Sequence, residues 1–220
     1  MNDLTLLIPA KNESESLPLV LKEIENYPIK KLIVMEKEDT LTLSSIKNFD
    51  CEIHTQISKG YGSAIIEGIE KINTKYLCIF NADGSFDPKE LEEMYNKTQS
   101  NNFVFGSRYE KDAGSDDDTL LTLIGNKIFS AAGKIFFKLR LNDILYTYVL
   151  GRTDLFKKLL LLETDFRICI EIPINIINKK FSYTHNSSHE RSRLKGVKKV
   201  SEFKDGFKIL IYLIKRIIKK

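Results

Sequence analysis

The fold is decided by residues 59–88, KGYGSAIIEGIEKINTKYLCIFNADGSFDP, which pass from loop to helix to strand to acidic turn. Ser63 is a suitable N-cap for a helix whose apolar residues recur at helical spacing. Those apolar residues are Ile65, Ile66, Ile69 and Ile72. Residues 76–80, YLCIF, form a continuous apolar run, which is typical of a strand buried on both faces of a parallel sheet. The stretch therefore predicts a helix–strand repeat of an α/β protein.

An acidic turn, NADGS at 81–85, follows that strand directly. Open α/β sheets bind ligands at the carboxyl ends of their strands. We expect a structural role for Asp87, because it can cap a new helix with Pro88 at the first position and Glu90 closing a capping box. Asp83 has no such local role, and a carboxylate held at a strand end suits a divalent cation that carries phosphate oxygens.

The rest of the chain repeats the alternation of strand and helix. Short apolar runs predict strands at 4–9, 32–35, 51–57, 103–105 and 181–185. Strands that alternate with helices at this spacing indicate βαβ units, and hence a mostly parallel sheet flanked by helices. We expect one domain over residues 1–200 and an appended helix over residues 201–220.

Bulk composition is that of an ordinary globular protein, with 42% hydrophobic and 29% charged residues in 220. The three cysteines lack the spacing of a metal site, which favours core positions in a reducing compartment. No signal peptide is recognisable, and no run approaches the roughly 20 apolar residues of a membrane span. A cytoplasmic protein without a transmembrane span is expected.

Charge is concentrated at the carboxyl end. Residues 191–220 contain eleven Lys or Arg and two acidic residues, a net charge of +9, which leaves −5 for residues 1–190 of a chain whose total is +4. A basic end on an acidic body indicates an anionic partner such as pyrophosphate or anionic lipid. Nucleic acid is not expected, since the aromatic residues of this end follow helical spacing and do not form a stacking series.

Two helices carry unusual apolar surfaces. Residues 119–139 are apolar on nearly every face, and burial is favoured over contact with lipid. The segment from Glu202 to the end is a basic amphipathic helix, which can lie on the headgroups of an inner membrane face or pack on the domain. Its apolar stripe consists of Phe203, Phe207, Leu210, Ile211, Ile214 and Ile218.

Six motifs taken together resemble the family 2 glycosyltransferases of GT-A (Rossmann-like) fold, and most closely the dolichyl- or polyprenyl-phosphate sugar synthases. The motifs are IPAKNESESLP near the start, GYGSAI and NADGSFDP in the central stretch, GSRY at 106–109, NDILYTYVLGR at 142–152 and RLKGVKK at 193–199. The resemblance implies an inverting glycosyltransferase that moves a sugar from a nucleotide-sugar donor. The implied acceptor is a polyprenyl phosphate or a glycan, in the synthesis of cell-surface polysaccharide or glycolipid.

The resemblance also implies a donor site with Mg²⁺ or Mn²⁺ as cofactor. Asp83 takes the place of the metal-binding Asp of the family, and Asn81 replaces the other acidic residue of that turn. Arg193 and Lys199 match a basic lid that closes over the donor pyrophosphate. The other donor-binding residues implied are Pro9, Ala10, Asn12, Glu13, Glu36, Lys59, Gly60 and Ala82.

Three further residues are implied near the acceptor. Arg108 matches a residue that faces the acceptor phosphate, although it could instead pair with the acidic residues 116–118. Asp143 and Glu171 match acidic family positions, and each could be a general base or a buried structural acid. With Asp83, these form the candidate catalytic set.

Two other functions stay open. A sugar nucleotidyltransferase shares the sheet and the metal carboxylate, but it would require a glycine-rich loop near residue 10, where the sequence IPAKNES has no glycine. A catalytically impaired nucleotide-binding relic is suggested by Asn81 and by the altered segment EKED at 36–39.

Overall fold

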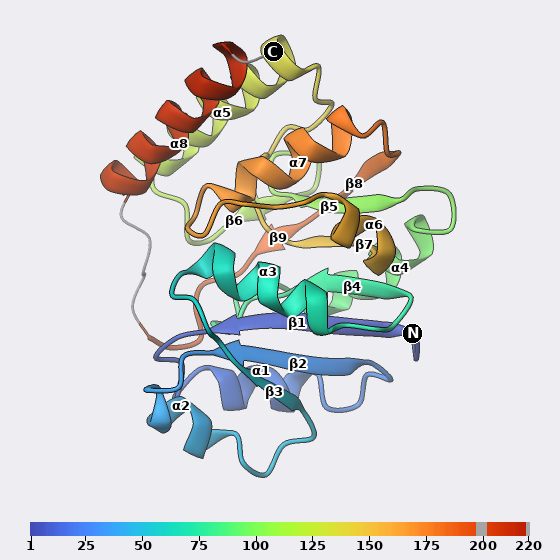
Figure 1. The fold of residues 1–220 in the computed structure, drawn as a ribbon, viewed down its shortest axis with the longest axis vertical. Helices are drawn as coiled ribbons and strands as arrows, with labels where there is room; N and C mark the ends of the chain where they lie inside the picture. Colours follow the sequence, from blue (N-terminus) through green and yellow to red (C-terminus); the bar gives the residue numbers. More distant parts are fainter. Residues whose placement is uncertain (197–201, 219–220) are drawn as a thin grey trace.

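A computed structural model describes residues 1–196 and 202–218. These residues form a seven-stranded sheet of order β3-β2-β1-β4-β7-β5-β8, with helices on both faces (Figure 1). Strand β7 runs antiparallel to both of its neighbours, and all other pairs in this sheet are parallel. The predicted α/β class with a mostly parallel sheet is therefore confirmed. The strands are β1 Leu4–Ala10, β2 Lys30–Met35, β3 Glu52–Thr55, β4 Tyr76–Ile79, β5 Phe103–Ser107, β7 Val149–Arg152 and β8 Tyr183–Ser187.

Two short strands, β6 Gly114–Ser115 and β9 His189–Glu190, pair in a separate small sheet. They tie the loop after β5 to the segment after β8. The helices of the described residues are α1 Leu17–Glu23, α2 Thr40–Ser45, α3 Tyr61–Lys71, the 3₁₀ helix η1 Pro88–Glu90, α4 Leu91–Lys97, α5 Leu120–Phe137, α6 Thr153–Lys158, α7 Ile168–Asn178 and α8 Glu202–Ile218.

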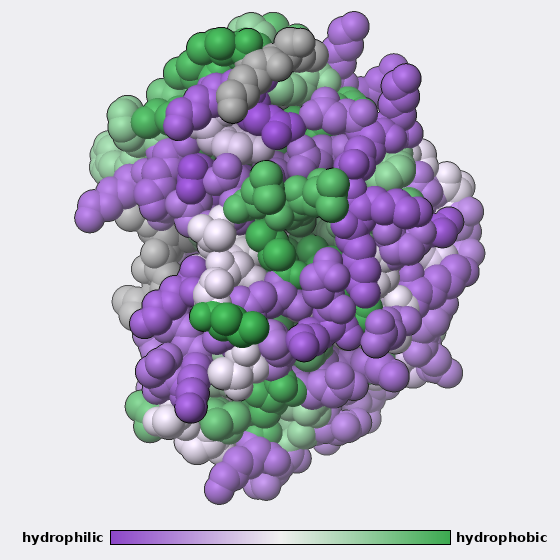
Figure 2. All heavy atoms as spheres, viewed as in Figure 1, coloured by the Kyte–Doolittle hydropathy of each residue, from purple (hydrophilic) through white to green (hydrophobic). Residues whose placement is uncertain are grey.

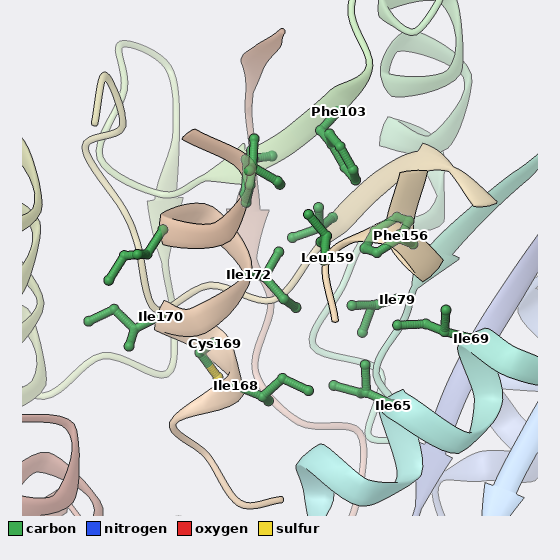
Figure 3. Packing of buried hydrophobic residues seen from close by; sticks show 14 of the residues in the cluster. Ile65, Ile69, Ile79, Phe103, Phe156, Leu159, Ile168, Cys169, Ile170 and Ile172 are labelled. Carbon is green, nitrogen blue, oxygen red and sulfur yellow. The ribbon is translucent and has the colours of Figure 1, made fainter. Parts of the chain in front are cut away.

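The sheet separates two apolar cores, because successive strand residues point to opposite faces. Leu7 of β1 belongs to the core under α3, α6 and α7, whereas its neighbours Leu6 and Ile8 belong to the core under α1 and α4. Figure 3 shows the first core, in which Ile65 and Ile69 of α3 face Ile79 of β4. Every strand of the sheet centre is thus buried on both faces, as its continuous apolar sequence predicts.

The sequence did not predict β7. Its residues lie in the segment 147–152, TYVLGR, which shows no regular alternation of apolar and polar residues. The strand is inserted antiparallel between β4 and β5, near the middle of an otherwise parallel sheet. In this position Val149 pairs with Ile79 of β4 and Phe105 of β5. These residues lie far apart in the chain, so their pairing cannot be predicted from the local sequence.

Capping also differs from expectation at two helices. Gly60 is the N-cap of α3, and the Ser63 hydroxyl donates to the Lys59 carbonyl within the first turn. Asp87 does cap η1 by accepting from the Lys89 N–H at 3.0 Å. Glu90 does not close the expected capping box, because its carboxylate accepts from Ser188 and from the His189 N–H.

Helix α5 is not buried, contrary to expectation. Leu120 and Ile135 are 74% and 72% exposed, and the exposed apolar residues of α5 continue through Leu121, Ile124 and Ile128. Among the described residues it is the one helix long and apolar enough to cross a membrane, with a mean hydropathy of 1.3, and 22% of it is buried in the protein. Lys127 and Lys134 interrupt its apolar residues, so the helix does not contain a continuous apolar run of about 20 residues, in agreement with the sequence.

Helix α8 lies beside α5 (Figure 1). Ile209, Tyr212 and Leu213 are buried in the core, and Arg216 donates to the Asn175 side chain of α7 at 2.8 Å. The stripe predicted from the sequence points elsewhere, since all six of its residues are exposed, Phe203 by 78%. Figure 2 shows hydrophobic side chains gathered at the top of the molecule, over α5 and α8.

Candidate active site

A pocket of about 820 Å³ opens at the carboxyl ends of β1 and β4. Its volume is within the range of sites that bind nucleotide-sized ligands. Its lining has two parts. The strand-end wall consists of Pro9, Ala10, Asn12, Glu13, Glu36, Gly60, Asn81, Ala82 and Asp83. The helical wall consists of Leu121, Phe129, Phe203, Phe207, Ile209 and Leu210.

The segment after β1 turns sharply into the pocket. Asn12 adopts φ of 52°, a left-handed conformation that Asn tolerates better than most residues. Its N–H donates to Asp39 at 2.6 Å, and the same Asp39 carboxylate caps α2 through Thr42. Residues 36–39, which departed from the family motif, therefore support the turn that presents Asn12 and Glu13.

Charged side chains of the strand-end wall are already paired. Lys11 donates to Glu36 at 2.7 Å, and the buried Glu13 accepts from the Ser16 hydroxyl. A ribose or base that binds here would meet carboxylate acceptors held in place by α1 and β2. This arrangement suits recognition of hydroxyl and amino groups.

The glycines of the GYG motif are required by a close approach of two segments. A Cβ on Gly60 would lie 2.3 Å from the Thr164 carbonyl oxygen, and one on Gly62 would lie 2.1 Å from that of Glu163. The Ser63 N–H donates to the Thr164 carbonyl at 3.1 Å. The amino end of α3 is thus fixed against the loop before α7, which places Gly60 and Tyr61 in the pocket.

Asp83 lies where the sequence analysis placed it, at the carboxyl end of β4 and facing the pocket. One carboxylate oxygen, Oδ1, accepts from the Ser85 N–H at 3.0 Å and from the Ser85 hydroxyl at 2.7 Å. The other, Oδ2, lies 2.7 Å from Nη1 of Arg193. Asn81 donates its amide N–H to Ser85 at 3.1 Å, which orients the side chain beside Asp83.

The chemistry of this turn fits a divalent cation that is shared with a ligand. Among the described residues no three acidic, His or Cys side chains cluster tightly enough to hold a metal by themselves. Mg²⁺ is commonly held by one or two carboxylates together with substrate phosphates, so one carboxylate and an adjacent amide suffice when the donor supplies the other oxygens. Asp83 and Asn81 would hold such an ion.

Arg108 lies in the pocket but is fully engaged by carboxylates. Its Nε and Nη2 donate to Asp143 at 2.7 and 3.0 Å, and its Nη1 donates to Glu190 at 2.9 Å and to Asp118 at 3.4 Å. Burial alone would lower the pKa of Arg108, but the charge of Asp143 and its hydrogen bonds raise that pKa well above the ordinary value. The alternative expected for Arg108, pairing within residues 116–118, is thus realised through Asp118.

Asp143 and Glu171 do not line the pocket. Asp143 is 0% exposed and holds Arg108 in position. Glu171 is 2% exposed and accepts from the backbone N–H groups of Leu162 and Glu163 at 2.9–3.1 Å. Burial raises the pKa of Glu171, and these N–H donors oppose the rise. Of the two roles considered, this geometry favours buried structural acids.

Of the carboxylates that reach the pocket near Arg108, the sequence indicated the acidic residues 116–118, as ion-pair partners of Arg108, but gave no indication of Glu190. Asp117, Asp118 and Glu190 line the pocket, and Glu190 is brought there by the β6–β9 pairing. Lys59 is exposed and does not line the pocket, whereas its neighbour Gly60 does. Lys199 lies outside the described residues, so its role in a lid stays a prediction.

The family model for glycosyl transferase family 2 matches residues 5–160. Among curated proteins, an uncharacterized glycosyltransferase of Mycobacterium tuberculosis (strain ATCC 25618 / H37Rv) is 31% identical over 91 residues, and one of Mycobacterium bovis is equally similar. The match spans 41% of this chain and 41% of each of these relatives.

Solved structures resemble the chain over nearly its whole length. Glucosyl-3-phosphoglycerate synthase from Mycobacterium tuberculosis, in complex with Mn²⁺, UDP-glucose and phosphoglyceric acid, gives a TM-score of 0.77 at 11% identity. The alignment covers 97% of this chain and 79% of that one. Mannosyl-3-phosphoglycerate synthase from Rubrobacter xylanophilus gives a TM-score of 0.74 at 13% identity, covering 98% and 74%. At these identities the likeness concerns the fold.

Proposed function

Because this chain belongs to glycosyl transferase family 2, we propose that it transfers a sugar, with inversion, from a nucleotide-sugar donor to a lipid-linked acceptor at a membrane surface. A divalent cation, Mg²⁺ or Mn²⁺, would be held by Asp83 and Asn81 during the reaction. The observation that carries the proposal is the position of Asp83, which faces a pocket of about 820 Å³ at the carboxyl end of a central strand.

The strand-end wall is the proposed donor site. Asn12, Glu13 and Glu36 offer polar groups for base and ribose, and Asp83 offers a carboxylate for the pyrophosphate-bound cation. When bound, the cation would neutralise charge that develops on the leaving nucleoside diphosphate. The likeness of the fold to a synthase crystallised with Mn²⁺ and UDP-glucose supports a site of this kind.

The helical wall is the proposed acceptor side. Phe203, Phe207 and Leu210 of α8 and Leu121 of α5 line the pocket and are exposed. The pocket is therefore bordered on this side by uncovered apolar side chains of both helices. A small, fully polar acceptor would make no apolar contact with these side chains, whereas the lipid chain of a lipid-linked acceptor would pack along them.

The reactive group of that acceptor is proposed to be a glycan hydroxyl in preference to a polyprenyl phosphate. Arg108, the basic residue implied to bind the acceptor phosphate, is engaged by Asp143, Glu190 and Asp118. A hydroxyl needs a general base, and Asp118 and Glu190 are carboxylates that line the pocket. Asp143 and Glu171, the bases considered from the sequence, are shielded from the pocket by burial.

The same two helices support the proposed association with the inner face of an anionic membrane. Lysines flank the exposed apolar stripes, with Lys127 and Lys134 on α5 and Lys204 and Lys215 on α8. Helices of this composition lie in the headgroup region, with their apolar side chains inserted and their lysines against anionic lipid. The membrane would then present the acceptor directly to the helical wall.

Turnover with defined donors and acceptors tests the proposal. UDP-, GDP-, CMP- and dTDP-sugars are supplied with Mn²⁺ or Mg²⁺ or with EDTA, and release of nucleotide is measured in the presence of a polyprenyl phosphate or a lipid-linked glycan. Cation-dependent release that requires the lipid-linked glycan supports the whole proposal. Release driven by the polyprenyl phosphate alone would support the donor site and contradict the hydroxyl acceptor.

A nucleotidyltransferase is no better supported, because the segment after β1 contains no glycine-rich loop and Glu13 and Asn12 fill its place. An impaired relic would bind nucleotide without releasing it from a sugar, so the same turnover assay excludes or establishes it.

A further inference from the structure

The carboxylate proposed to hold the cation already holds a cationic side chain. Arg193 places Nη1 2.7 Å from Oδ2 of Asp83, with both side chains largely shielded from solvent. Oδ1 of Asp83 is used by the two bonds from Ser85. In this arrangement the metal-binding oxygen of Asp83 is covered by a guanidinium.

The backbone that carries Arg193 is fixed on the acidic turn. The Arg191 N–H donates to the Ser85 carbonyl at 2.9 Å, and the Leu194 N–H donates to the Asp83 carbonyl at 2.9 Å. Leu194 also packs over Gly84, where a Cβ would lie 2.5 Å from the leucine side chain and φ is +82°. The contact between Arg193 and Asp83 is therefore bracketed by two backbone bonds to the same turn.

The guanidinium itself is held less completely than its backbone. Its Nε is buried and has no hydrogen-bond partner among the described residues, and the Asp117 carboxylate lies 3.7 Å from it. The side chain can thus leave Asp83 by rotation while Arg191 and Leu194 keep the backbone in place. Arg193 also lines the pocket that would contain the donor pyrophosphate.

From these contacts we infer that Arg193 and the divalent cation compete for Oδ2 of Asp83. Cation binding displaces the guanidinium, which then becomes a free donor for the pyrophosphate in the same pocket. This inference rests on the proposed function and adds a binding order to it: the free protein binds cations weakly, and cation and donor bind tightly together. Arg193 has two opposite effects, since it competes with the cation before the donor arrives and holds the donor afterwards.

Cation binding without nucleotide tests the competition. Binding of Mn²⁺ to the full chain is measured by titration calorimetry or by the electron paramagnetic resonance signal of free Mn²⁺, for the wild type and for Arg193→Gln. Removal of the competing ion pair is expected to tighten Mn²⁺ binding about fivefold, the equivalent of about 1 kcal/mol. With Mn²⁺ saturating, the same variant is expected to bind the nucleoside diphosphate about tenfold more weakly, because one charge-assisted contact is lost.

Two further variants keep the outcomes distinct. Lys195→Gln removes the same charge from an exposed position of the same segment and should leave Mn²⁺ binding within about twofold of wild type. Asp83→Asn should abolish Mn²⁺ binding both in the otherwise wild-type protein and in the Arg193→Gln variant. If Arg193→Gln leaves Mn²⁺ affinity unchanged or weaker while Asp83→Asn abolishes binding, the competition is wrong and the metal site stands. If Asp83→Asn has no effect either, the proposed metal site fails together with the competition.

Discussion

The two walls of the pocket are built by opposite means. In the strand-end wall, polar side chains are fixed by backbone bonds and ion pairs, as Asp83 is by Ser85 and Arg193. In the helical wall, Phe203 and Phe207 project from a helix whose apolar stripe has no protein cover among the described residues. The charged side chains of the first wall have partners within the chain, whereas the apolar side chains Phe203 and Phe207 of the second are exposed.

Under the proposed function, this difference would separate the two substrates. Apart from the inferred displacement of Arg193, the polar groups of the strand-end wall are held in position before the donor binds, which favours transfer chemistry. An uncovered apolar wall instead recruits its partner by burial of apolar surface, which is not directional and tolerates variation in the partner. We therefore expect changes in the strand-end wall to affect donor binding and changes in the helical wall to affect access of the acceptor.

The largest effect is expected at the carboxylates between the two walls. One of the two carboxylates, Glu190 or Asp118, is expected to be the general base. Replacing that residue, by Glu190→Gln or by Asp118→Asn, should lower kcat by about 10²–10⁴-fold and leave donor affinity unchanged. The base is needed only if the acceptor is a hydroxyl, since a phosphate monoester is already ionised near neutral pH. Single-turnover rates with saturating donor measure the effect, and the acid limb of the pH–rate profile should disappear with it.

Asp143→Asn is the matched control for that prediction. It exchanges one carboxylate for an amide in contact with the same Arg108, but at a buried position outside the pocket. It should cost about 3 kcal/mol of unfolding free energy, because the buried guanidinium of Arg108 loses the carboxylate that accepts from its Nε and Nη2. A larger loss of kcat in stable Asp143→Asn protein than in both pocket variants would contradict the assignment.

A smaller effect is expected at the helical wall. The pair Lys204→Gln and Lys215→Gln should weaken binding to vesicles that contain anionic lipid by about 2 kcal/mol, or roughly thirtyfold, since each lysine near such a surface contributes about 1 kcal/mol. Co-sedimentation at low and high salt measures it. Lys111→Gln with Lys158→Gln is a control, since these exposed lysines lie away from α5 and α8.

Vesicle binding that does not depend on anionic lipid, on salt or on the Lys204 and Lys215 substitutions would contradict the proposal that the apolar faces of α5 and α8 contact a membrane. Concentration-dependent dimerisation, lost when Phe203 and Phe207 are replaced by Ser, would instead assign the surface to a second copy of the chain. Both outcomes would leave the donor site unaffected.

The smallest effect concerns how the strand-end wall is held at its far side. Glu67 accepts from the N–H groups of Ile57 and Ser58 at 2.9 and 2.8 Å and contacts His54, which fixes the loop before Gly60. Burial alone would raise the pKa of Glu67, but the hydrogen bonds from Ser58, Ile57 and His54 together lower this pKa below its ordinary value. A lowered pKa stabilises the fold above the unfolded value, and this contribution is lost as pH falls through the folded pKa.

Replacement by Gln removes that contribution. Glu67→Gln should therefore reduce stability at neutral pH by about 1 kcal/mol, and the difference from wild type should shrink as pH falls below about 4.5. Thermal unfolding of both proteins as a function of pH measures this difference. A difference that stays constant as pH falls from neutral to well below the ordinary pKa of a glutamate would mean that the loop is not held by the ionised carboxylate.

The strand-end wall could be predicted from the sequence because its causes are local. A buried strand such as 76–79 is a short apolar run, and the turn that follows it must lie at the sheet edge. Asp83, Asn12 and Glu13 therefore reach the pocket as expected. The role of residues 36–39 could not be read in the same way, since Asp39 acts through its contact with Asn12, 27 residues away.

The helical wall could not be predicted, because composition does not distinguish a helix buried by protein from one left exposed. Helix α5 has the apolar residues of a buried helix. It is exposed because no other element of the described residues packs over its apolar face. Among the partners of Arg108, Asp118 was one of the acidic residues expected from the sequence, whereas Glu190 was not expected, for a related reason. Glu190 lies 82 residues further along the chain and reaches Arg108 through strand pairing between β6 and β9.

Cation-dependent donor binding by wild type and Asp83→Ala tests the central claim most directly. Thermal shift is recorded with each nucleoside diphosphate sugar, with Mn²⁺ and with EDTA. Wild type should be stabilised by one donor in Mn²⁺ and not in EDTA, by about 2.7 kcal/mol at a hundredfold excess over Kd. Asp83→Ala should unfold cooperatively and show no such stabilisation, since the cation loses its carboxylate. Equal, Mn²⁺-dependent stabilisation of both proteins would contradict the account.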